Sequence, residues 1–252
     1  MKITERVAIW GRVIYSLLAT FTGVKADIMD AEATTDAISG GKSLIRFGDG
    51  EFGIYRGKNI HYQDWSPELQ RDFEAIKRDY ESDPDACPYI LAVPRQFMTV
   101  SGLKLMKKRV YVSSWAESRL QFKQTFRRDI PYGDSFLFEK ANKDIYSGIW
   151  CKSEKENVIF VHNNPEYAEH FAKTYGKNTV HVLCPSKNAY SDVDGIYDKI
   201  LSVISENSWS ADDVCITISA GPAGKVLVYR LSALGYHSVD AGHCWDDPLE
   251  GI

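Results

Sequence analysis

Two acidic side chains separated by one glycine are the strongest candidates for chemistry in this chain of 252 residues. Asp49 and Glu51 follow residues 43–47, a short apolar segment typical of a buried strand. Carboxylate oxygens are the ligands that Mg²⁺ and Mn²⁺ prefer, and a divalent ion held there can neutralise a departing diphosphate. Gly48 and Gly50 let the backbone bend and let a bulky anion approach. The alternative is a polar turn with solvated acids, because Asp-Gly pairs are common in turns.

A glycine-rich segment at residues 219–225, Ser-Ala-Gly-Pro-Ala-Gly-Lys, is a second candidate and joins a predicted strand to a predicted helix. Backbone N–H groups at a helix N-terminus bind phosphate. Gly221 and Gly224 would permit its close approach, and Lys225 would add a positive charge. The segment is not a Walker A loop, because Val226 stands where Ser or Thr is required. An ordinary strand-to-helix turn is the alternative.

Two weaker patterns also follow predicted strands. Residues 184–190 contain Ser186 and Asn188, whose side chains suit a ribose, a base or a phosphate. Near the end of the chain, His243 can act as a neutral metal ligand or a proton carrier, and Asp246 can supply a base. The alternatives are a polar loop for the first pattern and a core histidine with solvated acids for the second.

The elements that must position these side chains are clearest in the second half of the chain. There, strands alternate with helices of a length that predicts a parallel sheet covered on both faces. The first half predicts a helix with Ser66 as its N-cap, further strands and helices, and a loop-rich stretch at residues 129–152. The predicted strands are 43–47, 89–93, 109–113, 157–162, 179–184, 213–219 and 236–240, and the predicted helices are 66–80, 117–128, 165–175, 195–206 and 223–234.

The first 26 residues predict an amphipathic helical extension, followed by a single α/β domain at residues 27–252. Its apolar side chains recur at helical spacing, and its other face is polar. We expect this helix to pack on its own domain or on a second subunit, with a helix lying on the membrane surface as the alternative. The apolar positions are Val7, Trp10, Val13, Ile14, Leu17, Leu18 and Phe21, and the polar ones are Glu5, Arg12, Ser16 and Thr20.

The amino-acid composition indicates which binding partners and which cellular compartment to expect. The formal net charge of −4 argues against nucleic acid, because proteins that bind its phosphate backbone usually carry a basic excess. The five cysteines include no C-x-x-C pair, which favours a reducing compartment over disulfides or zinc. No segment is long and apolar enough to span a bilayer. We expect a cytoplasmic protein, which the N-terminal helix could bring to the inner face of the membrane.

The order of these motifs resembles that of the GT-D-fold glycosyltransferases, a family first catalogued as a domain of unknown function in bacterial polysaccharide and glycoprotein biosynthesis. The matching segments together cover roughly residues 42–245. R-F-G-D-G-E-F is the most specific of them. They are residues 43–52 (S-L-I-R-F-G-D-G-E-F), 184–189 (C-P-S-K-N-A), 219–227 (S-A-G-P-A-G-K-V-L), 234–236 (L-G-Y) and 240–243 (D-A-G-H).

The resemblance implies a Rossmann-like, mostly parallel sheet and transfer of a hexose from a nucleotide donor, typically a UDP-sugar, to a glycan, glycolipid or glycoprotein acceptor. It also implies that Asp49 and Glu51 serve a metal, Mn²⁺ or Mg²⁺, and the diphosphate. Two alternatives are a non-catalytic module that binds nucleotide-sugar or phosphate, and a metal-dependent phosphotransferase or phosphohydrolase. The predicted site is Asp49, Glu51 and Asp246 for catalysis, Asp49, Glu51 and His243 for the metal, and Arg46, Gly48, Ser186, Asn188, Gly221, Gly224 and Lys225 for the nucleotide-sugar.

Overall fold

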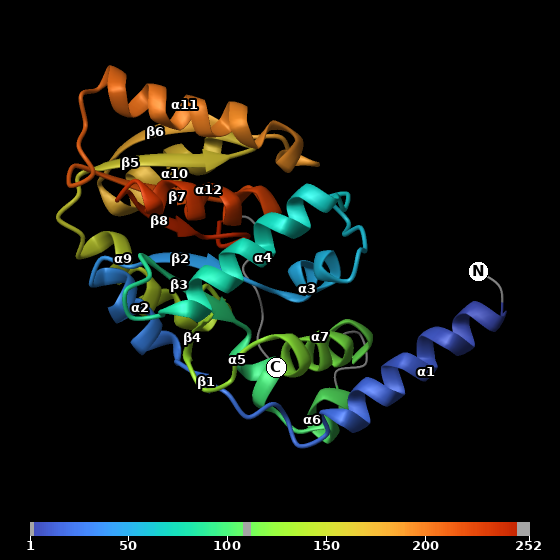
Figure 1. Cartoon of the computed structure of the whole chain (residues 1–252). Helices are drawn as coiled ribbons and strands as arrows, with labels where there is room; N and C mark the ends of the chain where they lie inside the picture. The colour runs from blue at the N-terminus through green and yellow to red at the C-terminus, as the bar shows by residue number, and fades with distance from the viewer. Residues whose placement is uncertain (1–2, 108–111, 246–252) are drawn as a thin grey trace.

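The computed structural model describes residues 3–107 and 112–245, and its centre is one sheet of eight strands (Figure 1). Every strand pair is parallel, in the order β1-β4-β3-β2-β8-β7-β5-β6. The predicted parallel α/β fold is therefore confirmed. The strands are β1 (Asp27–Ile28), β2 (Ser43–Arg46), β3 (Tyr89–Val93), β4 (Pro131–Asp134), β5 (Asn157–His162), β6 (Asn178–Leu183), β7 (Val214–Ile218) and β8 (His237–Asp240).

Helices cover both faces of the sheet, because its central strands are apolar on both faces. Along β2, Ile45 belongs to one buried cluster and its neighbour Leu44 to the other. The first cluster includes side chains of α4 (Pro67–Ser82), α11 (Val193–Glu206) and α12 (Pro222–Ala233), and the second those of α2 (Ala31–Ser39), α9 (Gly148–Cys151) and α10 (Pro165–Tyr175). The other helices are α1 (Ile3–Ala19), α3 (Asp49–Tyr55), α5 (Arg95–Thr99), α6 (Gly102–Lys107), α7 (Val112–Thr125) and α8 (Lys143–Tyr146), with short 3₁₀ turns at Lys140–Asn142 and Ala189–Asp192.

The second half follows its sequence signals closely. Helix α10 begins at Pro165 after an Asn164 cap whose side chain accepts from the Glu166 amide, and Gly176 ends it in the left-handed conformation. In α4, Ser66 caps the Leu69 amide, as its position before Pro67 predicts. Local capping and hydrophobic periodicity agree in these elements, so their boundaries match the predicted ones within two residues.

The first half departs from the prediction where tertiary contacts override local signals. The strand predicted at residues 109–113 is wrong at Val112 and Ser113, which begin helix α7, whereas residues 109–111 lie outside the described residues. The stretch predicted as loop contains β4, whose sequence Pro-Tyr-Gly-Asp is poor in strand formers. Pairing with β1 and β3 on either side holds it in the sheet.

Helix α1 packs one face on α7 and projects from the body beside α6 (Figure 1). Val13 and Leu17 are buried at this contact, so the predicted packing on the same domain is present for these two residues only. The other five predicted apolar positions are exposed, namely Val7, Trp10, Ile14, Leu18 and Phe21. The predicted polar face is wrong for Ser16 and Thr20, which are buried as well. The Thr20 hydroxyl donates to the Ser16 carbonyl, which satisfies it inside the contact. None of the described helices has both the length and the apolar character needed to cross a bilayer.

Candidate active site

A cleft of about 320 Å³ lies at the carboxyl ends of the central strands. The chain moves outward from β2 to β4 and later returns inward from the edge strand β6 through β7 to β8, so β2 and β8 meet where the strand order reverses. Ligands of open α/β sheets bind at such a point. The cleft is lined by Arg46, Gly48, Asp49, Gly50, Glu51, Tyr62, Phe97, Trp115, Ser135, Phe136, His162, Asn163, Pro185, Ser186, Ala189, Ser219, Ala220, Gly221, Lys225, Gly242 and His243.

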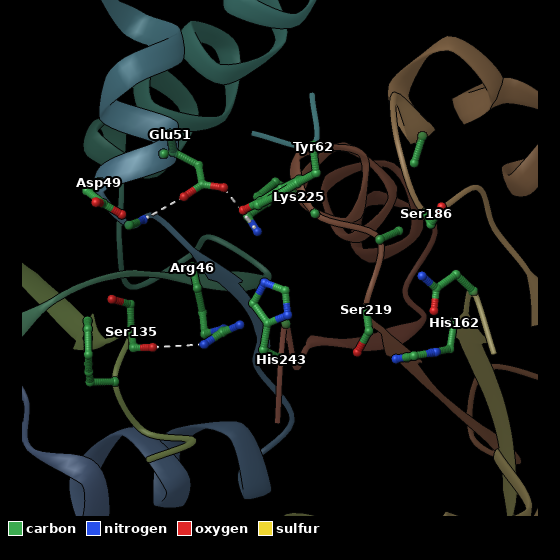
Figure 2. A pocket seen from close by; sticks show the side chains of 18 of the residues that line it. Arg46, Asp49, Glu51, Tyr62, Ser135, His162, Ser186, Ser219, Lys225 and His243 are labelled. Atoms are coloured by element: carbon green, nitrogen blue, oxygen red, sulfur yellow. Dashed lines mark hydrogen bonds and ion pairs between the residues drawn. The ribbon is translucent and has the colours of Figure 1, made fainter. Parts of the chain in front are cut away.

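Arg46, the last residue of β2, lies at the floor of the cleft, and its side chain bonds to residues at the ends of β4 and β8. Its Nε donates to the Asp240 carbonyl at 2.7 Å, and its Nη1 donates to the Ser135 carbonyl at 2.9 Å (Figure 2). Its Nη2 lies 3.7 Å from the Asp240 carboxylate. A Cβ at Gly242, which has a φ of +54°, would overlap this guanidinium. The glycine is therefore required both by the backbone and by the arginine.

Lys225 joins the floor of the cleft to the acidic motif. Its Nζ lies 3.3 Å from Glu51 Oε1 and 3.1 Å from Asp240 Oδ2, and all three side chains are buried. Burial lowers the pKa of Lys225, but the charges of Asp240 and Glu51 outweigh that effect and raise the pKa above its usual value. The lysine is therefore a fixed positive charge between two carboxylates.

Asp49 and Glu51 stand in the first turn of helix α3, where the sequence predicted a bend. Glu51 Oε2 accepts a 2.7 Å hydrogen bond from the Gly48 amide and so caps the helix. Burial raises the pKa of Asp49, the hydrogen bond with Ser114 lowers it, and the neighbouring Glu51 charge raises it again, for a net rise. Both carboxylate oxygens of Glu51 therefore contact groups of the protein itself, whereas Asp49 is only half-buried at the cleft wall.

Tyr62 closes the cleft over the start of α12. A Cβ at Gly221, whose φ is +54°, would lie 2.9 Å from the tyrosine ring, so the glycine allows this contact. The ring also meets that of His243 edge-on, at a centroid distance of 6.0 Å. Burial first, and the Glu51 charge second, raise the pKa of Tyr62 to about 12. The hydroxyl is therefore a hydrogen-bonding group rather than an anion at neutral pH.

The ends of β5, β6 and β7 supply a neutral side of the cleft, with Ser186, Ser219 and His162 (Figure 2). The Nδ1 atom of His162 accepts from the Asn164 amide at 3.0 Å, which assigns the proton of the neutral ring to Nε2. Ser219 Oγ is buried without a hydrogen-bond partner among the described residues. A buried hydroxyl of this kind is costly unless a ligand or water satisfies it.

The structure brings most of the predicted residues together, but two of them lie off the cleft. Asn188 exchanges hydrogen bonds with Asp64 and donates its amide to the Tyr62 carbonyl, so it fixes the Tyr62 loop. At Gly224 a Cβ would meet Ile218 at 3.2 Å, which shows that the glycine lets α12 approach β7. Asp246 lies outside the described residues. The nucleotide-sugar and catalytic roles assigned to these three residues stay predictions.

Whether a divalent cation fits the cleft depends on the two carboxylates of α3, Asp49 and Glu51. Within residues 3–107 and 112–245, no three His, Cys, Asp or Glu side chains gather as a ready-made metal site, and His243 does not complete one. Mg²⁺ sites often use only one or two carboxylates and complete their shell with water and substrate phosphates. Asp49, at the cleft wall, fits that mode as a single carboxylate, whereas both oxygens of Glu51 already contact Gly48 or Lys225, so the metal role of Glu51 stays a prediction.

Several lining residues were absent from the sequence prediction. His162 is the last residue of a predicted strand and Asn163 follows it, so the rule that identified Asp49 also applies to them. Asp240 begins the motif D-A-G-H, but nothing in the sequence indicates that its carboxylate lies beside Arg46 and Lys225. Phe97, Trp115 and Phe136, which form the aromatic wall, had no sequence signal, because their pattern is that of ordinary core residues.

The fold is that of an α/β protein with a cleft at the carboxyl ends of a parallel sheet, the place where ligands of such folds bind. The chain belongs to the family of glycosyltransferases with the GT-D fold, whose model matches residues 44–160 and 172–247. The family predicted from the sequence motifs is thus confirmed.

Two relatives from streptococci carry related sequences. The probable glycosyl transferase Gly of Streptococcus gordonii is 23% identical over 216 residues, which make up 81% of this chain and 30% of that protein. Glycosyltransferase GlyD of Streptococcus pneumoniae serotype 4 is 27% identical over 222 residues, 80% of this chain and 24% of that protein. The chain therefore spans less than a third of the length of either relative.

Solved structures show the same architecture. A structure described as a new glycosyltransferase (DUF1792) from Streptococcus sanguinis has a TM-score of 0.67 and 24% identity, covering 87% of this chain and 82% of that one. A second, described as the highly conserved domain of unknown function 1792 with a distinct glycosyltransferase fold, has a TM-score of 0.68 and 20% identity, covering 94% and 83%. At these identities the likeness establishes the fold.

Proposed function

We propose that this chain transfers a hexosyl group from a nucleotide-sugar donor, a UDP-sugar, to a glycan, glycolipid or glycoprotein acceptor, assisted by Mn²⁺ or Mg²⁺. Membership in a glycosyltransferase family supports the reaction class. The observation that carries the proposal is the charge arrangement of the cleft, in which the half-buried Asp49 stands beside the ion-paired Glu51 and Lys225.

The charge balance supports a cation in the bound state. Arg46 and Lys225 pair with the carboxylates of Asp240 and Glu51, and Asp49 adds a third carboxylate at the cleft wall, where its charge acts on Arg56. A diphosphate adds further negative charge, and like charges at close range repel strongly in a partly buried site. A divalent ion between Asp49 and the diphosphate would relieve that repulsion and supply Lewis-acid assistance to the leaving group.

The residues of the chain then have separable tasks. Asp49 would hold the cation, and Glu51 keeps the α3 turn in place through its cap on Gly48. The backbone at the start of α12, beside Gly221, is suited to a phosphate oxygen because it is the N-terminus of a helix of 12 residues. Ser219 and Ser186 on the neutral side would bond to the ribose or base.

The reaction itself exchanges one bond at the sugar. The bond between the anomeric carbon and the diphosphate oxygen breaks, and its electron pair passes to the diphosphate. An acceptor hydroxyl oxygen forms the new bond to the anomeric carbon, and the hydroxyl proton passes to a base. The carboxylate predicted for that task is Asp246. Donor and acceptor held together in one cleft react as neighbours, which lowers the entropic part of the barrier.

A donor panel tests the proposal. The purified chain would be incubated with UDP-, GDP- and dTDP-sugars, Mn²⁺ or Mg²⁺ and aryl-glycoside acceptors, and the products separated by mass spectrometry. Nucleoside diphosphate together with a glycosylated acceptor is the expected result, and it should be lost in Asp49→Asn but not in Asp198→Asn, a change at an exposed position on α11. Inorganic phosphate as the product would identify a phosphohydrolase, and donor binding without turnover would identify a binding module.

A further inference from the structure

The exposed apolar surface of this protein is concentrated on one side. Eight of the ten large hydrophobic side chains that are exposed among the described residues lie on α1, just after it or on α6. Soluble proteins rarely leave such a surface uncovered, so it marks an interaction site. The eight are Val7, Trp10, Ile14, Tyr15, Leu18, Phe21, Leu103 and Met106.

On α1, four of these residues form a stripe. Val7, Trp10, Ile14 and Leu18 are spaced by three or four positions, so they share one helix face. They are between 54% and 67% exposed, although the adjacent face of the same helix, with Val13 and Leu17, is buried on α7. The helix therefore has an apolar side that its own domain does not use.

The stripe is held rigidly and continues onto α6. Lys123 of α7 donates to the Ala19 carbonyl at 2.8 Å, which secures the end of α1. The Gly102 amide of α6 donates to the Phe21 carbonyl at 2.6 Å, and a Cβ at Gly102 would meet the Phe21 ring at 2.6 Å. Leu103 and Met106 of α6 thereby join α1 in one apolar surface, the α1–α6 face, made of the eight side chains named above.

The distribution of charged residues around the α1–α6 face indicates what kind of partner binds there. Within the described residues, α1 and the segment just after it carry Arg6, Arg12 and Lys25 against Glu5, and α6 carries Lys104 and Lys107 with no acid, in a chain whose net charge is −4. The fold brings α1 and α6 together where Gly102 lies against Leu17 and Phe21, and Arg12 on α1 is paired with Glu117 of α7. Lys104 and Lys107 are exposed beside Leu103 and Met106, whereas Glu5 and Arg12 share the helix side away from the stripe.

Two copies meeting through this surface would set cations against cations, which is unfavourable. An anionic bilayer instead matches both features, because apolar side chains enter the boundary of the headgroup layer while Lys and Arg pair with lipid phosphates. Trp10 and Tyr15 suit that boundary as well, since their rings are amphipathic.

We propose that the α1–α6 face docks this protein on an anionic lipid bilayer, with Trp10, Ile14 and Leu18 inserted at the headgroup boundary and Lys104 and Lys107 on lipid phosphates. The same helix α7 that braces α1 also carries Trp115 into the cleft wall, so docking holds the cleft close to the membrane surface. The docking does not depend on the proposed sugar transfer, because none of the inserted residues lines the cleft.

Vesicle flotation with the full chain tests the proposal, using phosphatidylcholine vesicles with and without phosphatidylglycerol. The wild type should float with the anionic vesicles and be released by salt. The double variant Trp10→Glu with Leu18→Glu should lose at least about tenfold in vesicle affinity, because charges resist entry into the headgroup boundary. Lys104→Glu with Lys107→Glu should also weaken binding. Leu234→Glu, a control at an exposed apolar position outside the face, should bind as the wild type does.

Circular dichroism and light scattering on the same samples complete the test. Each variant should keep the wild-type spectrum and mass, because the replaced side chains are exposed. Equal binding to phosphatidylcholine vesicles with and without the anionic lipid would overturn the assignment. So would the absence of vesicle binding, or a wild-type dimer that Trp10→Glu with Leu18→Glu converts into a monomer.

Discussion

The two sides of the cleft differ in how their polar groups are satisfied before a ligand enters. On the side of β2, β8 and α12, the charged groups form ion pairs with one another, as Lys225 does with Glu51 and Asp240, although Asp240 Oδ1 has no hydrogen bond among the described residues. On the side of β5 and β7, Ser219 Oγ has no partner among the described residues. The charged side is thus built by the fold itself, whereas the neutral side is completed by what binds there.

Replacing a residue on the charged side should therefore lower the stability of the fold, unless the side chain faces the ligand and has no ion pair within the protein. Asp49 is the exception, because it lies at the cleft wall and forms no ion pair among those described. Its replacement should therefore act on chemistry, and that of Lys225 on folding. A change on the neutral side should act on binding alone.

The largest effect is expected for Asp49→Asn. Loss of the carboxylate removes charge stabilisation of the leaving diphosphate, so turnover should fall about 100- to 1,000-fold, as for other electrostatic deletions. Initial rates with the donor found in the panel measure the loss. The melting temperature should not fall, because burial already raises the pKa of this carboxyl. Near wild-type turnover would remove Asp49 from the site.

Lys225→Met should mainly destabilise the fold. It leaves Glu51 and Asp240 buried without their shared cation, and breaking a buried ion pair costs about 3 kcal/mol or more. Urea unfolding followed by circular dichroism measures the change in the free energy of unfolding. Lys199→Met on α11, at an exposed position, is the control and should change it little. A Lys225→Met protein as stable as that control would show that the charged side is not built as described.

Ser219→Ala should show the opposite behaviour. Its buried hydroxyl has no partner in the described part of the chain, so its removal should leave the melting temperature unchanged or slightly higher. If the hydroxyl bonds to the bound nucleotide, affinity for UDP should fall about fivefold, the worth of one net hydrogen bond. Calorimetric titration compares this variant with Ser202→Ala, an exposed change on α11. Lower stability with unchanged affinity for UDP would show that the Ser219 hydroxyl supports the fold and does not bond to the nucleotide.

Glu139 provides the smallest and most specific test, because it is a buried carboxylate that accepts from Gln96. Burial first, and the Asp134 charge second, raise its pKa from 4.5 to about 7. Its folded state therefore prefers the protonated form. That contribution to stability is complete below pH 4.5 and is lost as the pH rises through about 7.

Glu139→Gln should accordingly raise the free energy of unfolding by about 1 kcal/mol at pH 8 and leave it nearly unchanged at pH 5. The amide keeps an oxygen that can accept from Gln96. Denaturant unfolding at the two pH values measures the difference. An equal effect at both would show that the carboxyl titrates normally in the folded chain.

The same contrast explains what the sequence could predict. Charged motifs such as R-F-G-D-G-E are rare in a buried setting, so they pointed to Arg46, Asp49 and Glu51, which the structure brings together with Lys225. Neutral lining residues such as His162 and Asn163 stand at the end of a predicted strand, but their residue types carry no distinctive motif, so the sequence alone did not identify them. Asn188 and Gly224 lie off the cleft and take part in a loop and a helix contact, and the roles predicted for them in binding the donor stay predictions.

For the fold, predictability followed the balance between local and tertiary forces. Helix α10 has its cap, its periodicity and its terminal glycine in sequence, and it was predicted correctly. Strand β4 depends on its neighbours β1 and β3, and the Ser16 and Thr20 side of α1 is buried by α7. Burial by partners distant in the chain leaves no local pattern, so these features required the structure.

The most direct test of the central claim is calorimetric titration of UDP, with and without Mn²⁺, into the wild type, Asp49→Asn and the control Asp198→Asn. The account predicts that Mn²⁺ tightens UDP binding at least about tenfold in the wild type and in the control, because the cation relieves repulsion between Asp49 and the diphosphate. In Asp49→Asn, that dependence on Mn²⁺ should be lost. A wild type that binds no UDP, or an Asp49→Asn variant with the full Mn²⁺ effect, would contradict it.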